Sequence, residues 1–533
     1  MTLPQQARLL SPPPQAVLTN AFGTPFDNAI ATARTCYAPR IVTAEDVARD
    51  ERARELRDRL ARETYQAGHH TTLQHATFQF ALTRVSRQLL WSFLHAHPFY
   101  NSEQVSQRYV EVKPGNALVP ELPERDLALY RRTLDAQQAA YRALCEILLA
   151  PTEAEYFRLF PGRRGTREKW LPQVKKKAQE VARYVLPVAT HAHLYHTVSG
   201  LTLHRYHRVS RSAELPVELG LLVDAMVAAV SAHDPLFFRD IEDPLPPEAT
   251  PEARLLDELG CGAAVGGARA RAFNQGFDAS LGGRVSKLVD YKVHAEAVLA
   301  DAVRATVGLT AHELPDAAAI RRVLSPGENR LFAESLTLTT LSKSARALSH
   351  PHYTFRKKLS HTADSQDQRH RMVPGSRPVL AAQYAGLRAG DEPDAILPEL
   401  VARTPAAREV YERSLRETFA AIDSLLDAGI ATGDALYLLP NAFPIRFEES
   451  GDLLHLHHKW TSRLCYTAQE EIWRASLEEV KQLREVHPLI GEQIMPPCTL
   501  RHEAGVRPTC PEGPRYCGVP VWRLEIDRYE RLI

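Results

Sequence analysis

The sequence predicts an α+β fold, in which small antiparallel sheets carry segregated helices and the whole arrangement occurs twice in tandem. Three observations lead to this class. Short stretches alternate apolar and polar residues as strands do, and long stretches repeat their apolar residues with the helical period. Three motifs also recur in the same order at similar separations. With 533 residues, the chain has ample material for more than one buried core.

The internal repeat is carried by three pairs of segments. Residues 82–87, 107–109 and 182–189 are echoed by residues 338–343, 368–370 and 435–442. Three matches in one order indicate a duplicated unit. We therefore predict a first module over residues 1–245, a linker over 246–280, a second module over 281–495 and a Cys-rich tail over 496–533.

Each module is predicted to open with a strand and then a helix. In the first module these are residues 17–22 and 27–37, and in the second they are 287–291 and 295–305. A further strand is predicted at residues 77–82, with its counterpart at 335–340. The long helical patterns cover residues 126–149, 174–185, 216–231, 404–428 and 468–486.

Composition argues against several partners. The formal net charge is +1, which gives no general attraction to nucleic acid or anionic membranes. No apolar run approaches the roughly 20 residues of a membrane span, and the N-terminus lacks the apolar core of a secretory signal. We expect a cytoplasmic protein without a nucleic-acid or membrane partner. A weaker alternative is nucleic-acid binding through the tail and the run Lys175-Lys176-Lys177, which the near-zero net charge opposes.

The most polar short segment covers residues 95–109 and follows an apolar run at 89–94. It gathers imidazoles, amides, a hydroxyl group and an arginine. A helix that runs into such a loop offers many hydrogen-bond donors to an anionic ligand. The simpler alternative is a polar loop with an ordinary capping role.

Three segments together point to a known family. They read Gly68-His69-His70-Thr71-Thr72-Leu73-Gln74-His75 before a Ser86-Arg87 helix, then Ser106-Gln107-Arg108-Tyr109, then Ala182-Arg183-Tyr184-Val185-Leu186-Pro187. In their order and in their residues, these segments resemble those of the flavin-dependent thymidylate synthases. The resemblance covers most of both modules, so the chain resembles two such subunits fused in tandem.

This resemblance implies reductive methylation of dUMP to dTMP. The carbon would come from methylenetetrahydrofolate, and the hydride from FAD that NADPH has reduced, with no protein nucleophile. The family shares its FAD and dUMP sites between the subunits of a homotetramer. Two fused modules are therefore expected to assemble as a homodimer that forms a pseudo-tetramer of modules.

The resemblance also assigns site residues. Its dUMP positions are Gln104, Ser106, Gln107, Arg108, Arg183, Arg369 and Arg463. Its FAD positions are His69, Thr71, Gln74, His95, His97, Arg356, Lys357, Lys358 and His458. These residue types suit the roles, because a guanidinium group donates a planar fork to paired oxygens and a histidine can donate to the oxygens of a flavin ring.

The chain departs from the family signature, which is Arg-His-Arg, seven residues and then Ser. In the first module, eight residues and not seven separate His95-Ala96-His97 from Ser106. A count of exactly seven residues back from Ser106 gives Ala96-His97-Pro98 instead. The second has Arg356-Lys357-Lys358, with Asp367 in place of the serine and Leu436 in place of Arg183. Since each module keeps parts that the other has lost, we predict one composite site between modules. The alternative is a non-catalytic nucleotide- or flavin-binding scaffold with degenerate sites.

The tail gathers Cys498, His502, Cys510 and Cys517 in a segment rich in Pro and Gly. Four such ligands suit a closed tetrahedral zinc site, and a metal would offset the ordering entropy of a segment with little core. An iron–sulfur cluster or free thiols are alternatives. The remaining cysteines, which are interpreted as small buried hydrophobic residues, are Cys36, Cys145, Cys261 and Cys465.

Overall fold

The computed structural model describes residues 9–96, 99–212, 214–259, 267–336, 338–387 and 391–533. It contains two four-stranded antiparallel sheets with the same topology, ordered β1-β2-β4-β3 and β5-β6-β8-β7. The first consists of β1 (Gln15–Ala21), β2 (Thr77–Ser86), β3 (Asn101–Gln104) and β4 (His191–Ser199). The second consists of β5 (Ser286–Tyr291), β6 (His352–Ser360), β7 (Gly375–Ser376) and β8 (Pro444–Asp452). The predicted α+β class and its tandem arrangement are confirmed.

Helices surround both sheets, and the predicted long helices are all present. The helices of the first module are α1 (Pro25–Thr35), α3 (Glu51–Gln66), α5 (Glu124–Ile147), α6 (Leu149–Leu159), α7 (Arg167–Ala182), α8 (Gly200–Val209) and α9 (Pro216–His233). Those of the second include α11 (Gly267–Leu281), α12 (Ala295–Val307), α13 (Asp316–Leu324), α14 (His361–Asp367), α17 (Pro405–Asp427), α19 (Leu453–Arg463) and α20 (Glu470–Val486). The tail carries α22 (Pro497–Glu503). None of the described helices is long and apolar enough to cross a membrane.

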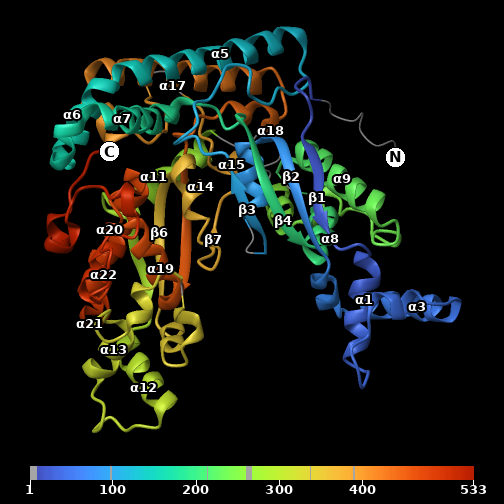
Figure 1. The fold of residues 1–533 in the computed structure, drawn as a ribbon. Helices are drawn as coiled ribbons and strands as arrows, with labels where there is room; N and C mark the ends of the chain where they lie inside the picture. Colours follow the sequence, from blue (N-terminus) through green and yellow to red (C-terminus); the bar gives the residue numbers. More distant parts are fainter. Residues whose placement is uncertain (1–8, 97–98, 213, 260–266, 337, 388–390) are drawn as a thin grey trace.

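The modules share a layer of helices and a continuous core. Figure 1 shows α5 and α17 running side by side above both sheets, with α7 beneath them. Tyr141 and Leu144 of α5 belong to the same buried cluster as Tyr411 and Leu415 of α17. Because one cluster includes side chains of both modules, burial of apolar area couples their stability.

The third pair of echoed segments lies where the two modules meet. Residues 182–189 and 435–442 each contain a 3-10 turn, Arg183–Val185 and Leu436–Leu438. Pro187 forms a bridge with Pro440, and the backbone N–H of Val188 donates to the Leu439 carbonyl at 2.8 Å. The two echoes thus pair with one another across the module boundary.

The first pair of echoed segments is corrected by the structure. The topology makes β6 the counterpart of β2, so the counterpart of residues 77–82 lies in His352–Ser360 and not in residues 335–340. The later stretch contains the 3-10 turn Thr339–Leu341, and Thr337 lies outside the described residues. Its β-branched residues favour a strand, but strand propensity counts only where a partner strand offers pairing and packing.

The expected linker also contains regular structure. The helix α11 (Gly267–Leu281) occupies the last part of the predicted 246–280 and ends one residue beyond it. The Asp278 carboxylate of this helix accepts from Lys358 Nζ on β6 at 2.6 Å. The module boundaries themselves stay a prediction.

Candidate functional site

The segment after β3 brings the first module against the second. Ser106 Oγ accepts from the backbone N–H of Arg108 at 3.2 Å, which closes a tight turn. Arg108 Nε donates to Glu180 on α7, and its Nη2 donates to the Thr467 carbonyl of the second module at 2.9 Å. Burial would raise the pKa of Glu180, but the charges of Arg108, Lys177 and Arg183 hold it at about 2. The Arg108 side chain is therefore fixed in place by partners from both modules.

Arg183 lies beside this turn, at the end of α7. Its side chain is buried, and among the described residues its Nε and Nη2 atoms have no hydrogen-bond partner. Burial lowers its pKa, Arg108 lowers it further, and Glu180 raises it. Asn441 of the second module donates to the Arg183 carbonyl at 3.0 Å and to Gln107 Oε1 at 3.2 Å. A buried guanidinium group with free N–H groups is an unusual feature that fits an anionic ligand.

Arg87 is a site residue to which the sequence analysis gave no role. It follows β2 directly, and its Nη1 and Nη2 donate to Gln104 Oε1 at 3.2 Å and to the Val105 carbonyl at 2.7 Å. Its Nε has no partner within the described structure. Burial, together with the charge of Arg183, lowers the pKa of Arg87 to about 9. The available signal was the Ser86-Arg87 pair at the end of a strand.

A cavity of about 450 Å³ adjoins these groups. Arg87, Gln107 and His191 all line it. Gln107 Nε2 and His191 Nε2 are buried and lack partners among the residues described. Since buried polar groups are normally satisfied, several unpaired nitrogens around one cavity indicate a polar ligand.

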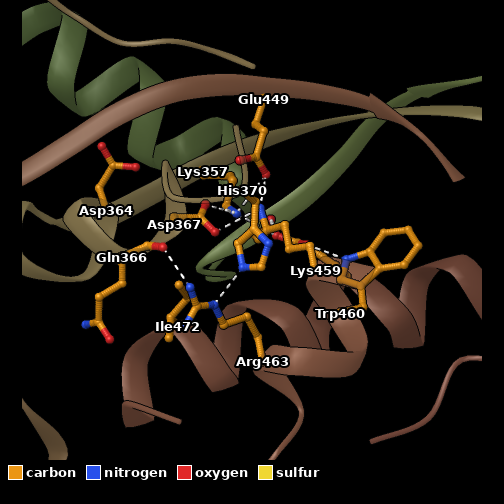
Figure 2. A network of polar contacts seen from close by, with 12 residues as sticks. Lys357, Asp364, Gln366, Asp367, His370, Glu449, Lys459, Trp460, Arg463 and Ile472 are labelled. Atoms are coloured by element: carbon orange, nitrogen blue, oxygen red, sulfur yellow. Dashed lines mark hydrogen bonds and ion pairs between the residues drawn. The ribbon is translucent and has the colours of Figure 1, made fainter. Parts of the chain in front are cut away.

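Arg463 approaches from the second module, at the end of α19. Its Nε donates to His370 Nε2 at 2.9 Å, and its Nη2 donates to the Gln366 carbonyl at 2.8 Å (Figure 2). Burial lowers its pKa to about 10; Asp367 acts in the opposite direction, and Arg108 adds to the lowering. Arg108 and Arg463 therefore lie within electrostatic range of one another. Arg369 is 40% exposed, 3.6 Å from the Glu103 carboxylate. It precedes β7, whereas Arg108 follows the equivalent strand β3, so the predicted echo of residues 107–109 in residues 368–370 is wrong.

The centre of the second module is filled by a buried ionic network (Figure 2). Lys357 Nζ lies 2.6 Å from Asp367, 3.1 Å from Glu449 and 2.9 Å from Glu479, and all four side chains are fully buried. Lys459 adds an ion pair with Asp367 at 2.9 Å. Burial would lower the pKa of Lys357, but the three carboxyl groups hold it well above its usual value. Burial and the nearby Asp367 raise the pKa of Glu449.

This network corrects the expectation of one cationic cluster at Arg356, Lys357 and Lys358. Successive strand residues point to opposite faces of a sheet. Arg356 and Lys358 point toward α11, where they contact Ser280 at 3.0 Å and Asp278 at 2.6 Å. Lys357 points the other way, into the ionic network, so its ammonium group is not available to a flavin in this chain.

The other expected flavin residues lie apart from Arg183. His69, Thr71 and Gln74 are exposed around the 3-10 turn His70–His75, at the start of β2. Arg87 follows the far end of that strand, and ten residues of strand span about 33 Å. One chain therefore does not bring these two groups of residues together.

The remaining flavin positions are buried, outside the described residues or near Arg463. His95 is buried and stacks on Tyr100, with ring centres 5.0 Å apart. The ring of His458 lies 6.0 Å from that of His370. His97 lies outside the described residues.

The tail does not form the predicted single-metal site. Among the described residues, no three His, Cys, Asp or Glu side chains are placed to hold one metal ion. His502 is exposed and stacks on Trp522, with ring centres 5.9 Å apart. Cys498 and Cys517 are buried and Cys510 is half-buried. The zinc prediction for this quartet thus gains no support.

Comparison with known proteins places both modules in one family. The family model described as "Thymidylate synthase complementing protein" matches residues 17–236 and again residues 287–489. A flavin-dependent thymidylate synthase from Geobacter sulfurreducens is 30% identical over 172 residues, which is 32% of this chain and 70% of the relative. The chain belongs to the flavin-dependent thymidylate synthase family. Ser106, Arg183 and Arg463 all lie inside the matched ranges, whereas the tail lies beyond them.

Two further relatives carry the same name. The flavin-dependent thymidylate synthase of Clostridium tetani is 26% identical over 212 residues, or 39% of this chain and 79% of the relative. That of Mycobacterium tuberculosis is 29% identical over 175 residues, or 33% of this chain and 66% of the relative. Each alignment is about as long as one module, in keeping with a tandem pair.

Proposed function

We propose that this chain is a FAD-dependent thymidylate synthase, which converts dUMP to dTMP with methylenetetrahydrofolate and NADPH at a composite site between its modules. The observation that carries the proposal is a pair of neighbouring guanidinium groups with unpaired N–H groups in the described structure: the buried Arg183, and the half-buried Arg87, which lines the 450 Å³ cavity. Family membership supplies the substrate class.

The basic and hydroxyl side chains near the module boundary suggest how dUMP binds. Arg183 would donate to phosphate oxygens through Nε and Nη2, which have no partner in the described structure. Ser106 adds a hydroxyl group, and Arg108 is already positioned by Glu180 and Thr467. Arg463 contributes positive charge from the second module. Such a preorganised set binds an anion without reorganising when the ligand arrives.

The exposed residues near the start of β2 fit a flavin. The side chains of His69, Thr71 and Gln74 offer ring, hydroxyl and amide groups on one short turn. Bound FAD, once reduced by NADPH, would supply the hydride. Because this turn lies about 33 Å of strand away from Arg87, we infer that the residues of a second chain complete the site. A homodimer forming a pseudo-tetramer of modules meets this requirement.

A non-catalytic nucleotide- or flavin-binding scaffold is the second candidate. It is favoured by the ionic network around Lys357, which fills the centre of the second module with the protein's own carboxylates. It is also favoured by the incomplete family signature, because Arg369-His370-Arg371 is followed seven residues later by Val379 and not by serine. On this alternative the first module binds a ligand and no turnover follows.

The visible absorption spectrum of the purified protein separates these candidates from a chain that has lost the cofactor. A bound flavin whose spectrum shifts on addition of dUMP supports a composite site. Tritium release from 5-tritiated dUMP, with NADPH and methylenetetrahydrofolate, then distinguishes the synthase from the scaffold. Absence of flavin after reconstitution with excess FAD would exclude the synthase.

A further inference from the structure

The strand β2 contains a β-bulge near its end, beside the cavity of the first module. The pairing of β2 with β4 shifts between Leu82 and Val85, so that Thr83 and Arg84 together face the single residue His193. Two residues opposite one form a β-bulge, which bends the strand locally and re-aims a side chain. The bulge thus sets the direction in which Arg84 leaves the sheet.

The second module has no bulge at this place, because β6 pairs with β8 without a shift along its whole length. Ser86 and Ser360 are equivalent, since each caps the helix after its strand and each donates to a buried glutamate. Two residues before these serines stand Arg84 and Lys358. Lys358 lies 2.6 Å from Asp278, whereas no hydrogen bond or ion pair holds the Arg84 side chain within the described part of the chain.

The backbone of Arg84 lies in the left-handed region, with a φ of 59°. Among the residues that the structure describes, it is the single non-glycine residue with a positive φ. In this region the Cβ atom comes too close to the following carbonyl oxygen, a cost that glycine avoids. Residues held in such a conformation are concentrated at ligand-binding and active sites. Arg84 therefore stands at a position where glycine would fold more easily.

Arg84 lines the 450 Å³ cavity together with two more cationic side chains, Arg87 and Lys113. Glu111 is the one acidic residue among those that line it, and it is exposed, 3.7 Å from Lys175. The charge around the cavity is therefore positive. A concave site lined by one sign of charge attracts ligands of the opposite sign.

The remaining walls suit the organic part of such a ligand. Three valines supply apolar contact, namely Val105, Val110 and Val112. His191 lies close to Arg84: burial and, after it, the charge of Arg84 lower the pKa of His191 to about 4, so its ring is neutral at pH 7. The cavity thus combines an apolar wall and a neutral imidazole with a cationic edge.

We propose that Arg84 is a ligand-binding residue of this cavity, where its guanidinium group binds an oxyanion group, phosphate or carboxylate, of the substrate. The inference deepens the proposed function and rests on it for the identity of the ligand. A guanidinium group donates a planar fork to the paired oxygens of either group. In the proposed reaction dUMP carries a phosphate, and methylenetetrahydrofolate carries the carboxylates of its glutamate.

Arg84→Gly should change stability and binding in opposite directions. The melting temperature should equal or exceed that of the wild type, because glycine relieves the strained backbone. The affinity for the ligand should fall about tenfold, because a hydrogen-bonding cation is lost. A residue retained for the fold alone would lower the melting temperature when removed and leave the affinity unchanged.

Two further variants isolate the guanidinium group. Arg84→Asn keeps a side chain that tolerates the left-handed region but has no fork and no charge. It should lose as much affinity as Arg84→Gly, which shows that the added backbone freedom of glycine is not the cause. Arg132→Gln is the matched control, because Arg132 is an exposed arginine of α5 outside the cavity lining, and it should bind like the wild type.

The measurement is thermal unfolding of the full-length chain with inorganic phosphate, dUMP or methylenetetrahydrofolate added. A ligand that binds the folded state raises the melting temperature in proportion to its occupancy. Inorganic phosphate should therefore raise it less in Arg84→Gly than in the wild type. A deficit confined to dUMP assigns Arg84 to the nucleotide phosphate, and one confined to methylenetetrahydrofolate assigns it to the carboxylates.

The outcomes separate this inference from the proposed function. An Arg84→Gly chain that melts below the wild type would overturn the inference, as would equal stabilisation of both chains by all three ligands. If phosphate stabilises the wild type through Arg84 but dUMP and methylenetetrahydrofolate do not bind, the inference holds and the synthase is excluded.

Discussion

At equivalent positions in their buried centres, the two modules carry different kinds of side chain. On β6, Lys357 pairs with Phe447; on β2, Leu82 pairs with Leu194 at the equivalent strand position. Glu449 lies three residues before Asp452, which caps α19, and His196 lies three residues before Ser199, which caps α8. A buried lysine and carboxylate in one module thus replace a leucine and a histidine in the other.

The difference continues on the helices. Lys459 of α19 corresponds to Tyr206 of α8, seven residues after each cap. Tyr206 lies 3.1 Å from His196, whereas Lys459 pairs with Asp367 and Glu449. In the second module the protein's own carboxylates occupy the centre, and in the first module unpaired donors remain around a cavity. Of two copies of one fold, one fills its centre with ion pairs, and the other has buried nitrogens without a hydrogen-bond partner in the described structure, around a cavity near the end of β2.

The largest loss of stability is expected from Lys357→Leu, which gives the second module the leucine that the first module has at the equivalent position, Leu82. The change leaves Asp367, Glu449 and Glu479 buried with one cation. Removing one partner of a buried ionic group costs about 3–5 kcal/mol of unfolding free energy, measurable by urea denaturation. Lys358→Leu is the matched control; its pair with Asp278 is partly exposed, so the loss should stay below about 1 kcal/mol. Equal losses would contradict the comparison.

Arg183→Leu makes the reverse exchange, because the second module has Leu436 at that position. It removes two unpaired N–H groups, so the fold should be no less stable. We expect the affinity for dUMP to fall about 100-fold, which corresponds to about 2.7 kcal/mol. Calorimetric titration of wild type, Arg183→Leu and the control Leu436→Met would measure it. Unchanged affinity in Arg183→Leu would exclude the composite site.

The free energy of unfolding at acid pH tests the ion pair between Glu180 and Arg108. The pKa of Glu180 is about 2 in the folded chain, against an ordinary 4.5. The unfolded chain therefore binds more protons between these values. The stabilisation is present above pH 4.5 and is lost as pH falls toward 2.

Glu180→Gln should remove up to about 3 kcal/mol at neutral pH and flatten the profile below pH 4.5. The control is Glu111→Gln, because Glu111 is exposed and 3.7 Å from Lys175. Denaturation at a series of pH values measures both. A Glu180→Gln profile parallel to that of wild type would show that the ion pair with Arg108 is not formed.

Many of the helices and strands could be predicted from the sequence. The side chains that fill the buried centre of each module could not. The strands at β1, β2 and β5 and the long helices follow from local periodicity. β6 was missed because Arg356, Lys357 and Lys358 conceal its alternation, and because the partners that allow Lys357 to be buried are distant in sequence. Arg87 resembles an ordinary surface arginine until the fold places Gln104, Val105 and Arg183 near it.

The smallest loss of stability is expected at a pair of carboxyl groups that make the same hydrogen bonds in both modules. Glu218 accepts from the backbone N–H and hydroxyl of Ser86, each at 2.7 Å, and from Tyr437 of the other module at 2.6 Å. Glu471 accepts in the same way from Ser360, each bond at 2.6 Å, and from Tyr184. The two modules thus exchange one tyrosine each across their boundary.

Glu218→Gln and Glu471→Gln should each lose about 1 kcal/mol at neutral pH, because an amide keeps one acceptor and loses the other. Burial raises the pKa of both carboxyl groups, so the folded chain holds these protons to higher pH than the unfolded chain. The stability of wild type therefore falls as pH rises through the folded pKa, and the loss in each variant should shrink over that range. Thermal unfolding of both variants should give matching losses. A much larger loss in Glu471→Gln would mean that the ionic network around Lys357 extends to this boundary, and that the modules differ there as well.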